Sequence, residues 1–203
     1  MGRMLRIVGF AVLALAAYLL FWPVPIKPVA WQPKPDAGYT GPHAANDRLS
    51  KVEVVSVEPE IGPEHIDFGP DGKLYTAVLS GAVLRMNPDG SQRETVVNTG
   101  GRPLGFDFTA DGTLVVADAF KGLLAVEPDG SVTVLTDTVD GDPIRYADAV
   151  VINDDGLMYF TDASRSLAAK DWGTFKAALL DVLEHSCTGR VLVYDPARRR
   201  TES

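Results

Sequence analysis

The sequence predicts an all-β fold, a β-propeller in which each sequence repeat forms one four-stranded blade. Two complete repeats and an interrupted third one occupy residues 62–91, 102–131, and 146–163 continued by 189–197. Asp-Gly pairs at 71–72, 111–112 and 155–156 recur after 40 and 44 residues. A repeat of this length, made of short strands and tight turns, is typical of a propeller blade.

Each repeat begins with two strands joined by the Asp-Gly turn. Asp and Gly suit this turn because they tolerate the positive φ of a hairpin. We expect the first strands at 66–68, 106–108 and 150–152. The second strands are apolar throughout, which fits strands buried on both faces between neighbouring blades. We expect them at 73–79, 113–119 and 157–163.

A glycine opens the third strand of each repeat, and an outer turn leads into the fourth. The glycines are Gly81, Gly122 and Gly189. We expect fourth strands at 93–97 and 132–135, whereas the third repeat reaches the last residues of the sequence where its fourth strand should begin. The valine-rich segment 52–57 predicts one more strand, an outer one that closes the ring.

Residues 1–26 predict a membrane-inserted segment. The apolar stretch 4–26 reaches the length of about 20 residues that crosses a bilayer. Arg3 and Arg6 precede its core, which favours a cytoplasmic N-terminus. An uncleaved signal anchor fits best, because a bulky Phe-Trp pair stands where a cleaved signal peptide needs small residues. Either kind of segment places the repeats outside the cytoplasm, in a periplasmic, extracellular or lumenal space.

The rest of the chain divides into a linker and a partial propeller. Six prolines between 23 and 47 favour extended backbone, so we read 27–48 as a spacer off the membrane. The propeller then occupies 49–203. Its blades are expected at about 58–98, 99–136 and 144–203.

An insertion at 164–188 separates the second and third strands of the third blade. Its apolar residues recur at steps of three or four, which predicts one face of a helix. These residues are Ala168, Trp172, Phe175, Leu179 and Leu183. We expect this face to pack on the propeller, and the helix to roof the mouth of a site.

Composition excludes several classes of protein. The net charge is −8 and no long basic run occurs, which argues against a nucleic-acid partner. The single cysteine, Cys187, allows no internal disulfide. Three blades leave two apolar faces bare, while propellers usually close with four to eight. We therefore read the chain as the N-terminal half of a longer propeller, and expect these blades alone to be unstable or to associate.

Superposition of the repeats gives a candidate site. Glu64, Leu104 and Asp148 each lie seven residues before their Asp-Gly pair, at the start of the innermost strand that lines the central channel. Two carboxylates that converge there could bind a hard cation such as Ca²⁺. They could also carry general acid–base chemistry if one charge raises the pKa of the other group. Carboxylates held only by water and backbone amides remain the simpler alternative.

Other polar residues are less suited to catalysis. His65 follows Glu64 and should point to the opposite side by strand alternation. His185 and Cys187 lack a visible third partner for nucleophilic catalysis. Asp118 and Asp162 share one repeat position, and we expect both to hold a turn or to link blades by hydrogen bonds.

The motifs together resemble the strictosidine synthase-like proteins, a group that includes the adipocyte plasma membrane-associated proteins and lies within the senescence marker protein/gluconolactonase superfamily. The resemblance rests on GPE at 62–64, GRPLG at 101–105, VADAFKGL at 116–123, YFTDAS at 159–164 and TGRVLVYDP at 188–196. It implies a six-bladed propeller of about twice this length, with an N-terminal anchor.

The resemblance also bears on function. In gluconolactonase-type members a glutamate like Glu64 binds a divalent metal, and Asp148 matches the second half of an Asn-Asp pair whose Asn is here Ala147. It implies a membrane-anchored hydrolase of small esters or lactones, with Glu64 and Asp148 as catalytic and metal-binding residues and Ca²⁺ as the metal. A strictosidine synthase-like condensing lyase, with its glutamate in a later blade, and a non-catalytic binding propeller are the alternatives.

Overall fold

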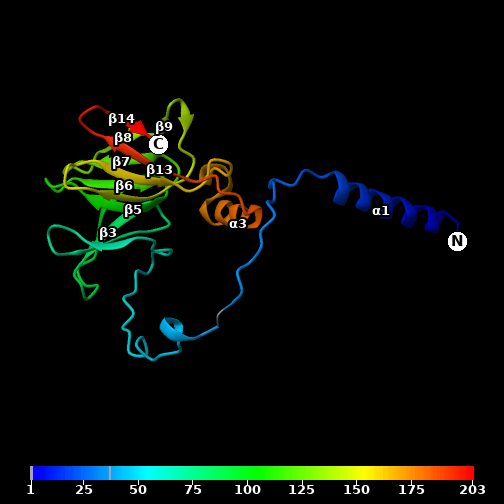
Figure 1. The fold of residues 1–203 in the computed structure, drawn as a ribbon, viewed down its shortest axis with the longest axis horizontal. Helices are drawn as coiled ribbons and strands as arrows, with labels where there is room; N and C mark the ends of the chain where they lie inside the picture. The colour runs from blue at the N-terminus through cyan, green and yellow to red at the C-terminus, as the bar shows by residue number, and fades with distance from the viewer. Residues whose placement is uncertain (1, 37) are drawn as a thin grey trace.

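The fold is mostly β, as predicted, in a computed structural model that describes residues 2–36 and 38–203 (Figure 1). Three four-stranded antiparallel sheets follow one another, each in simple meander order. The first sheet comprises β1 (Ile66–Phe68), β2 (Leu74–Ala77), β3 (Ala82–Met86) and β4 (Glu94–Asn98). The second comprises β5 (Pro103–Phe108), β6 (Leu114–Asp118), β7 (Gly122–Val126) and β8 (Val132–Thr136). The third comprises β11 (Ala147–Ile152), β12 (Met158–Asp162), β13 (Arg190–Asp195) and β14 (Arg200–Glu202).

Helices and a small hairpin complete the described chain. Helix α1 (Gly2–Phe21) projects away from the sheets and buries none of its residues (Figure 1). A short 3-10 helix, η1, lies in the linker, and α2 and α3 lie in the third-blade insertion. Their bounds are Gly41–His43, Ala169–Trp172 and Thr174–Glu184. Strands β9 (Thr138–Val139) and β10 (Asp142–Pro143) form a hairpin that the sequence did not predict.

The Asp-Gly turns form where the repeats place them. Gly72, Gly112 and Gly156 have φ values of 72°, 87° and 80°, a region that favours glycine. In the first turn the carboxylate of Asp71 accepts a hydrogen bond from the Lys73 amide at 3.1 Å. The turn thus fixes the register of β1 against β2 from local sequence alone.

The core lies between the sheets, as expected for propeller blades. Every residue of β6 and β7 in the middle sheet is buried. Aromatic residues of β5 pack against the first sheet, with Phe106 and Tyr75 ring centroids 6.4 Å apart. On the other side, the amide of Ile152 donates a hydrogen bond to Asp107 Oδ2 at 2.7 Å and ties the third sheet to the second.

One expectation about the strands is wrong, and another is confirmed. Residues 52–57 form no strand, and Val54 is largely exposed, because no strand edge among the described residues pairs with this segment. The fourth strand of the third blade begins at Arg200, as expected, and β14 pairs with β13 through Tyr194 and Thr201.

The predicted helix of the insertion is broken, and its packing face differs. Gly173 has a φ of 75° and separates α2 from α3, so the spacing from Trp172 does not continue into Phe175. Helix α3 packs through Ala177 and Glu184, which are buried, while Phe175 is exposed. The predicted face is therefore wrong for α3, although the helices do cover part of the propeller.

Candidate functional site

The three superimposed positions meet at one cavity. Glu64, just before β1, lines it together with Leu104 of β5 and Asp148 of β11. The cavity measures about 190 Å³, and its wall also includes His65 and Gly105. The sequence repeat thus places these residues correctly in space.

Backbone hydrogen bonds and a close approach position the two carboxylates. The amide of Glu64 donates to the Ala77 carbonyl at 3.0 Å, which extends the pairing of β1 with β2. Gly105 lets β5 approach β11, because a Cβ at this position would lie 2.6 Å from the Asp148 carbonyl oxygen. A glycine in β5 is therefore required to bring Asp148 toward the channel.

The electrostatics of the cavity act on the buried acid, Asp148. Burial raises the pKa of Asp148, and the charge of Glu64 raises it further. Burial also raises the pKa of Tyr146 to about 12, with added contributions from Asp148 and Glu64. Asp148 therefore keeps its proton to a higher pH than an ordinary aspartic acid does.

Arg102 is the main feature of the site that sequence reasoning missed. Its side chain is buried, and its Nη2 lies 3.7 Å from Glu64 Oε2 and donates to the Gly62 carbonyl at 3.1 Å. Its Nε and Nη1 are buried and have no hydrogen-bond partner among the described residues. The available signal was an arginine two residues before Leu104, directly in front of a mostly apolar strand.

Asp118 and Asp162 have the structural role that their shared repeat position predicted. Asp118 accepts hydrogen bonds from the amide of Arg102 at 3.0 Å and from Thr99 Oγ1 at 2.7 Å. Asp162 accepts equivalent bonds from the amide of Tyr146 at 2.9 Å. Each aspartate holds the entry to an innermost strand, and so fixes the residues that line the site.

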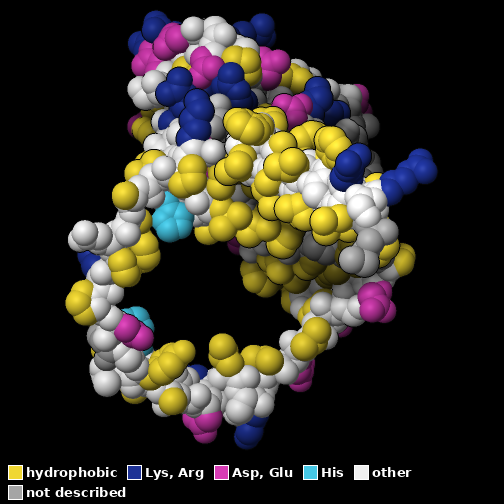
Figure 2. Space-filling model, turned by 90° about the vertical axis from the view of Figure 1, so that its right-hand side faces the viewer, with side chains coloured by type: hydrophobic (Ala, Val, Ile, Leu, Met, Phe, Trp, Pro, Cys, Tyr) yellow, Lys and Arg dark blue, Asp and Glu magenta, His cyan; other side chains and the backbone are white. Residues whose placement is uncertain are grey.

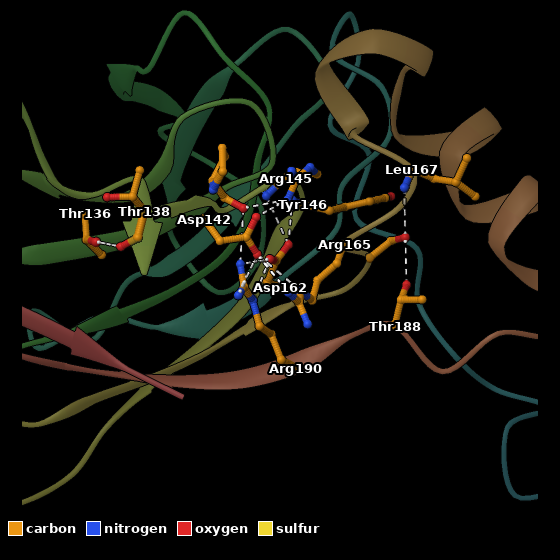
Figure 3. A network of polar contacts seen from close by, with 12 residues as sticks. Thr136, Thr138, Asp142, Arg145, Tyr146, Asp162, Arg165, Leu167, Thr188 and Arg190 are labelled. Carbon is orange, nitrogen blue, oxygen red and sulfur yellow. Dashed lines mark hydrogen bonds and ion pairs between the residues drawn. The ribbon is translucent and has the colours of Figure 1, made fainter. Parts of the chain in front are cut away.

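The third blade adds an ion network around its aspartate (Figure 3). Arg190 contacts Asp162 through Nη2 and Asp142 through Nη1, each at 3.0 Å. Arg145 and Arg165 also bind Asp142, at 2.9 and 3.1 Å. Because every arginine here has a carboxylate partner, we assign the network a structural role.

His65 and the insertion also contact the site. His65 lines the same cavity as Glu64, contrary to the alternation argument. Its ring packs edge-on against Phe106, with centroids 4.7 Å apart. Helix α3 covers the neighbouring surface, where the Tyr146 hydroxyl donates to the Thr174 carbonyl at 3.0 Å. His185 and Cys187 lie outside this cavity, and Cys187 is exposed.

The residues present fit part of a calcium site. Glu64 and Asp148 offer carboxylate oxygens, the donors that Ca²⁺ prefers, on one wall of the cavity. Among the described residues no group of three or more His, Cys, Asp or Glu side chains is arranged to hold a metal. Further ligands would have to be water or groups beyond this set, and the charge of Arg102 opposes cation binding at Glu64.

Comparisons with known proteins point to one group. Residues 41–86 match the family model described as strictosidine synthase-like, N-terminal. Protein STRICTOSIDINE SYNTHASE-LIKE 4 of Arabidopsis thaliana is 40% identical over 79% of this chain, and STRICTOSIDINE SYNTHASE-LIKE 7 of the same plant is 39% identical over 79%. The chain spans only 44% of the length of each relative.

A solved structure supports the fold. A gluconolactonase from Xanthomonas campestris superposes with a TM-score of 0.55 over 69% of this chain and 46% of its own, at 16% identity. At this identity the likeness bears on the fold alone. It agrees with the propeller predicted from the repeats, whereas the number of blades in a complete ring stays a prediction.

Proposed function

Since the chain resembles strictosidine synthase-like proteins and matches the N-terminal model of that family, we propose that it forms part of a membrane-anchored propeller hydrolase acting on small esters or lactones. One observation carries the proposal: Glu64 and Asp148 line the same cavity, and the pKa of Asp148 is raised by burial and by Glu64. A carboxyl group whose pKa is raised, beside a second carboxyl group in the same cavity, is an arrangement that suits acid–base hydrolysis.

The chemistry assigns one role to each carboxyl group. The Glu64 carboxylate accepts a proton from a water molecule as that water attacks the carbonyl carbon of the substrate. Protonated Asp148 donates its proton to the departing oxygen as the carbon–oxygen bond breaks. The products are a carboxylic acid and an alcohol, and a proton transfer between the two groups restores the starting state. Arg102 keeps a positive charge beside Glu64 throughout.

A bound Ca²⁺ is an alternative form of the proposal, in which both carboxyl groups would bind the metal in their ionised form. Glu64 and Asp148 would hold it, and it would supply a Lewis acid that polarises the substrate carbonyl. Treatment of the full-length protein with a calcium chelator should then abolish hydrolysis, and added Ca²⁺ should restore it. Full activity in the metal-free protein would contradict this part and leave the acid–base pair as the mechanism.

The central experiment is the Glu64→Gln substitution in the full-length protein, assayed on aryl esters and lactones. We expect a loss of about 100-fold or more in kcat, because a general base contributes about that much. Glu53→Gln is the matched control, since Glu53 is an exposed carboxylate in the segment that precedes β1. Unchanged turnover in Glu64→Gln would rule out the proposed role.

A condensing lyase is the second candidate, and the similarity to strictosidine synthase-like proteins favours it. Such an enzyme would join an amine to an aldehyde rather than cleave an ester. The two candidates separate in one assay of the full-length protein with both substrate classes. Binding of either class without turnover would instead indicate a ligand-binding propeller.

Membrane anchoring is the last part of the proposal. Among the described residues, α1 is the helix long and apolar enough to cross a bilayer, and a signal sequence shares these features. We propose that it is an uncleaved anchor, with Arg3 and Arg6 on the cytoplasmic side and the sheets on the other. The anchored protein should stay with membranes in alkaline carbonate, whereas a protein with a cleaved leader should be released.

A further inference from the structure

Helix α3 has two apolar faces, and only one of them packs on the sheets. The inner face joins a hydrophobic cluster with Leu104 and Tyr146 through Ala177 and Leu180. The outer face consists of Phe175, Leu179, Val182 and Leu183, which follow the helical spacing. Phe175 is 83% exposed and Val182 67% exposed. We call these four residues the α3 outer face.

The linker from the membrane helix binds the same helix. The amide of Lys27 donates to Glu184 Oε1 at 2.6 Å, and the amide of Val29 donates to the Glu184 carbonyl at 2.7 Å. The Trp31 ring lies edge-on to His185, with centroids 5.6 Å apart. These contacts tie the start of the linker to the C-terminal end of α3 (Figure 1).

Chain length then limits how far α3 can lie from the membrane. Lys27 is six residues beyond Phe21, the end of α1, and six residues span at most about 20 Å. Trp22, the first residue after α1, is an aromatic residue of the kind enriched at membrane interfaces. If α1 crosses a bilayer, α3 is held close to the surface of that bilayer.

We propose that the α3 outer face docks into the interfacial layer of the membrane that α1 crosses. An exposed helix face of Phe, Leu and Val is the apolar face of an interfacial helix, which inserts its side chains between lipid headgroups. Figure 2 views the molecule from the side toward which α1 projects, so that the exposed apolar side chains of α1 stand in front of the sheets. Helix α1 and helix α3 would then attach the propeller to the membrane at two points.

Docking would give the site a defined orientation. The Thr174 carbonyl at the start of α3 accepts the hydrogen bond of Tyr146, two residues before Asp148. The end of the propeller that carries the Glu64–Asp148 cavity would then lie at the membrane surface. Substrates would be amphiphilic esters or lactones that partition into the bilayer. This inference rests on the membrane anchoring proposed above.

The experiment measures the depth of α3 in lipid. Full-length protein with its native cysteines replaced by serine receives one cysteine, at Phe175 or at Val182, and is placed in phosphatidylcholine nanodiscs. Ser131→Cys is the control, because Ser131 is exposed on an outer turn of the second blade. Each cysteine carries an environment-sensitive fluorophore, tested with a lipid-attached quencher and with aqueous iodide.

We expect the lipid quencher to reduce the signal at Phe175 and Val182 at least about twofold more than at Ser131, because an interfacial helix buries its apolar face about 5–10 Å deep. Iodide should show the opposite order. Equal iodide quenching at Phe175 and Ser131 would overturn the proposal. Protection from both quenchers would overturn it too, and would show that another part of the protein covers α3. Release by alkaline carbonate would instead contradict the anchor itself.

Discussion

The guanidinium Nη2 of Arg102 lies 3.7 Å from the carboxylate Oε2 of Glu64. Arg102, which directly precedes the second sheet, therefore balances the negative charge of Glu64, which precedes the first sheet. Arg102 is itself fixed through its backbone amide, which donates to Asp118. A chain of contacts thus runs from the structural aspartate of the second blade to the acid pair. The net charge at the cavity therefore depends on Arg102 as well as on the two acids.

Replacement of Arg102 by glutamine should therefore raise the pKa of Asp148 further. The substitution removes a positive charge beside Glu64, so the negative potential at Asp148 grows and its protonated form gains stability. Titration of the Asp148 carboxyl carbon by NMR measures the shift directly. Arg85→Gln is the control, because Arg85 pairs with Glu94 and Asp71 outside the cavity. An identical titration in Arg102→Gln and the wild type would show that Arg102 has no influence on the pair.

Asp148→Asn should stabilise the protein at pH 7. The folded-state pKa of Asp148 is raised, so the folded protein holds this proton more tightly than the unfolded chain does. Ionisation of Asp148 therefore costs stability as the pH rises above its ordinary value of 3.8, and the cost is complete above the folded pKa. The gain from Asn should shrink as the pH falls toward 3.8 and vanish below it.

Asp129→Asn provides the control with the opposite sign. The pKa of Asp129 is lowered by its hydrogen bonds from Ser131, so its ionised form stabilises the fold above its ordinary pKa. This variant should be slightly less stable than the wild type at pH 7. Urea unfolding at pH 7 and pH 3 measures both differences. A loss of stability in Asp148→Asn at pH 7 would contradict the raised pKa.

The sequence was sufficient for the strands and for the convergence of Glu64 with Asp148. Asp-Gly turns and apolar runs act locally, and equal positions in equal repeats must meet near one axis. The burial of Arg102 could not be read in the same way, because it depends on Gly62 and Glu64 from another repeat. The positive φ of Gly173 interrupts the helix between α2 and α3, so the helical spacing predicted across residues 168–183 does not hold for α3.

The buried aspartate of the third blade should contribute far more stability than its exposed neighbour. Arg190 pairs with both Asp162, which is fully buried, and Asp142, which is about a third exposed (Figure 3). Asp162→Asn leaves the buried end of this pair without its charge and weakens the bonds to the backbone amides of Arg145 and Tyr146. We expect a loss of about 3 kcal/mol, typical of a broken buried pair.

Asp142→Asn is the matched control for Asp162→Asn. It removes a carboxylate from the same arginine at the surface, where solvent screens the interaction, and should cost no more than about 1 kcal/mol. Urea unfolding of the two variants compares a buried with an exposed partner of one guanidinium. Because Asp162 also positions Tyr146 beside the cavity, its loss should change the titration of Asp148, while the loss of Asp142 should not. Equal destabilisation by the two substitutions would mean that burial does not set the strength of this network.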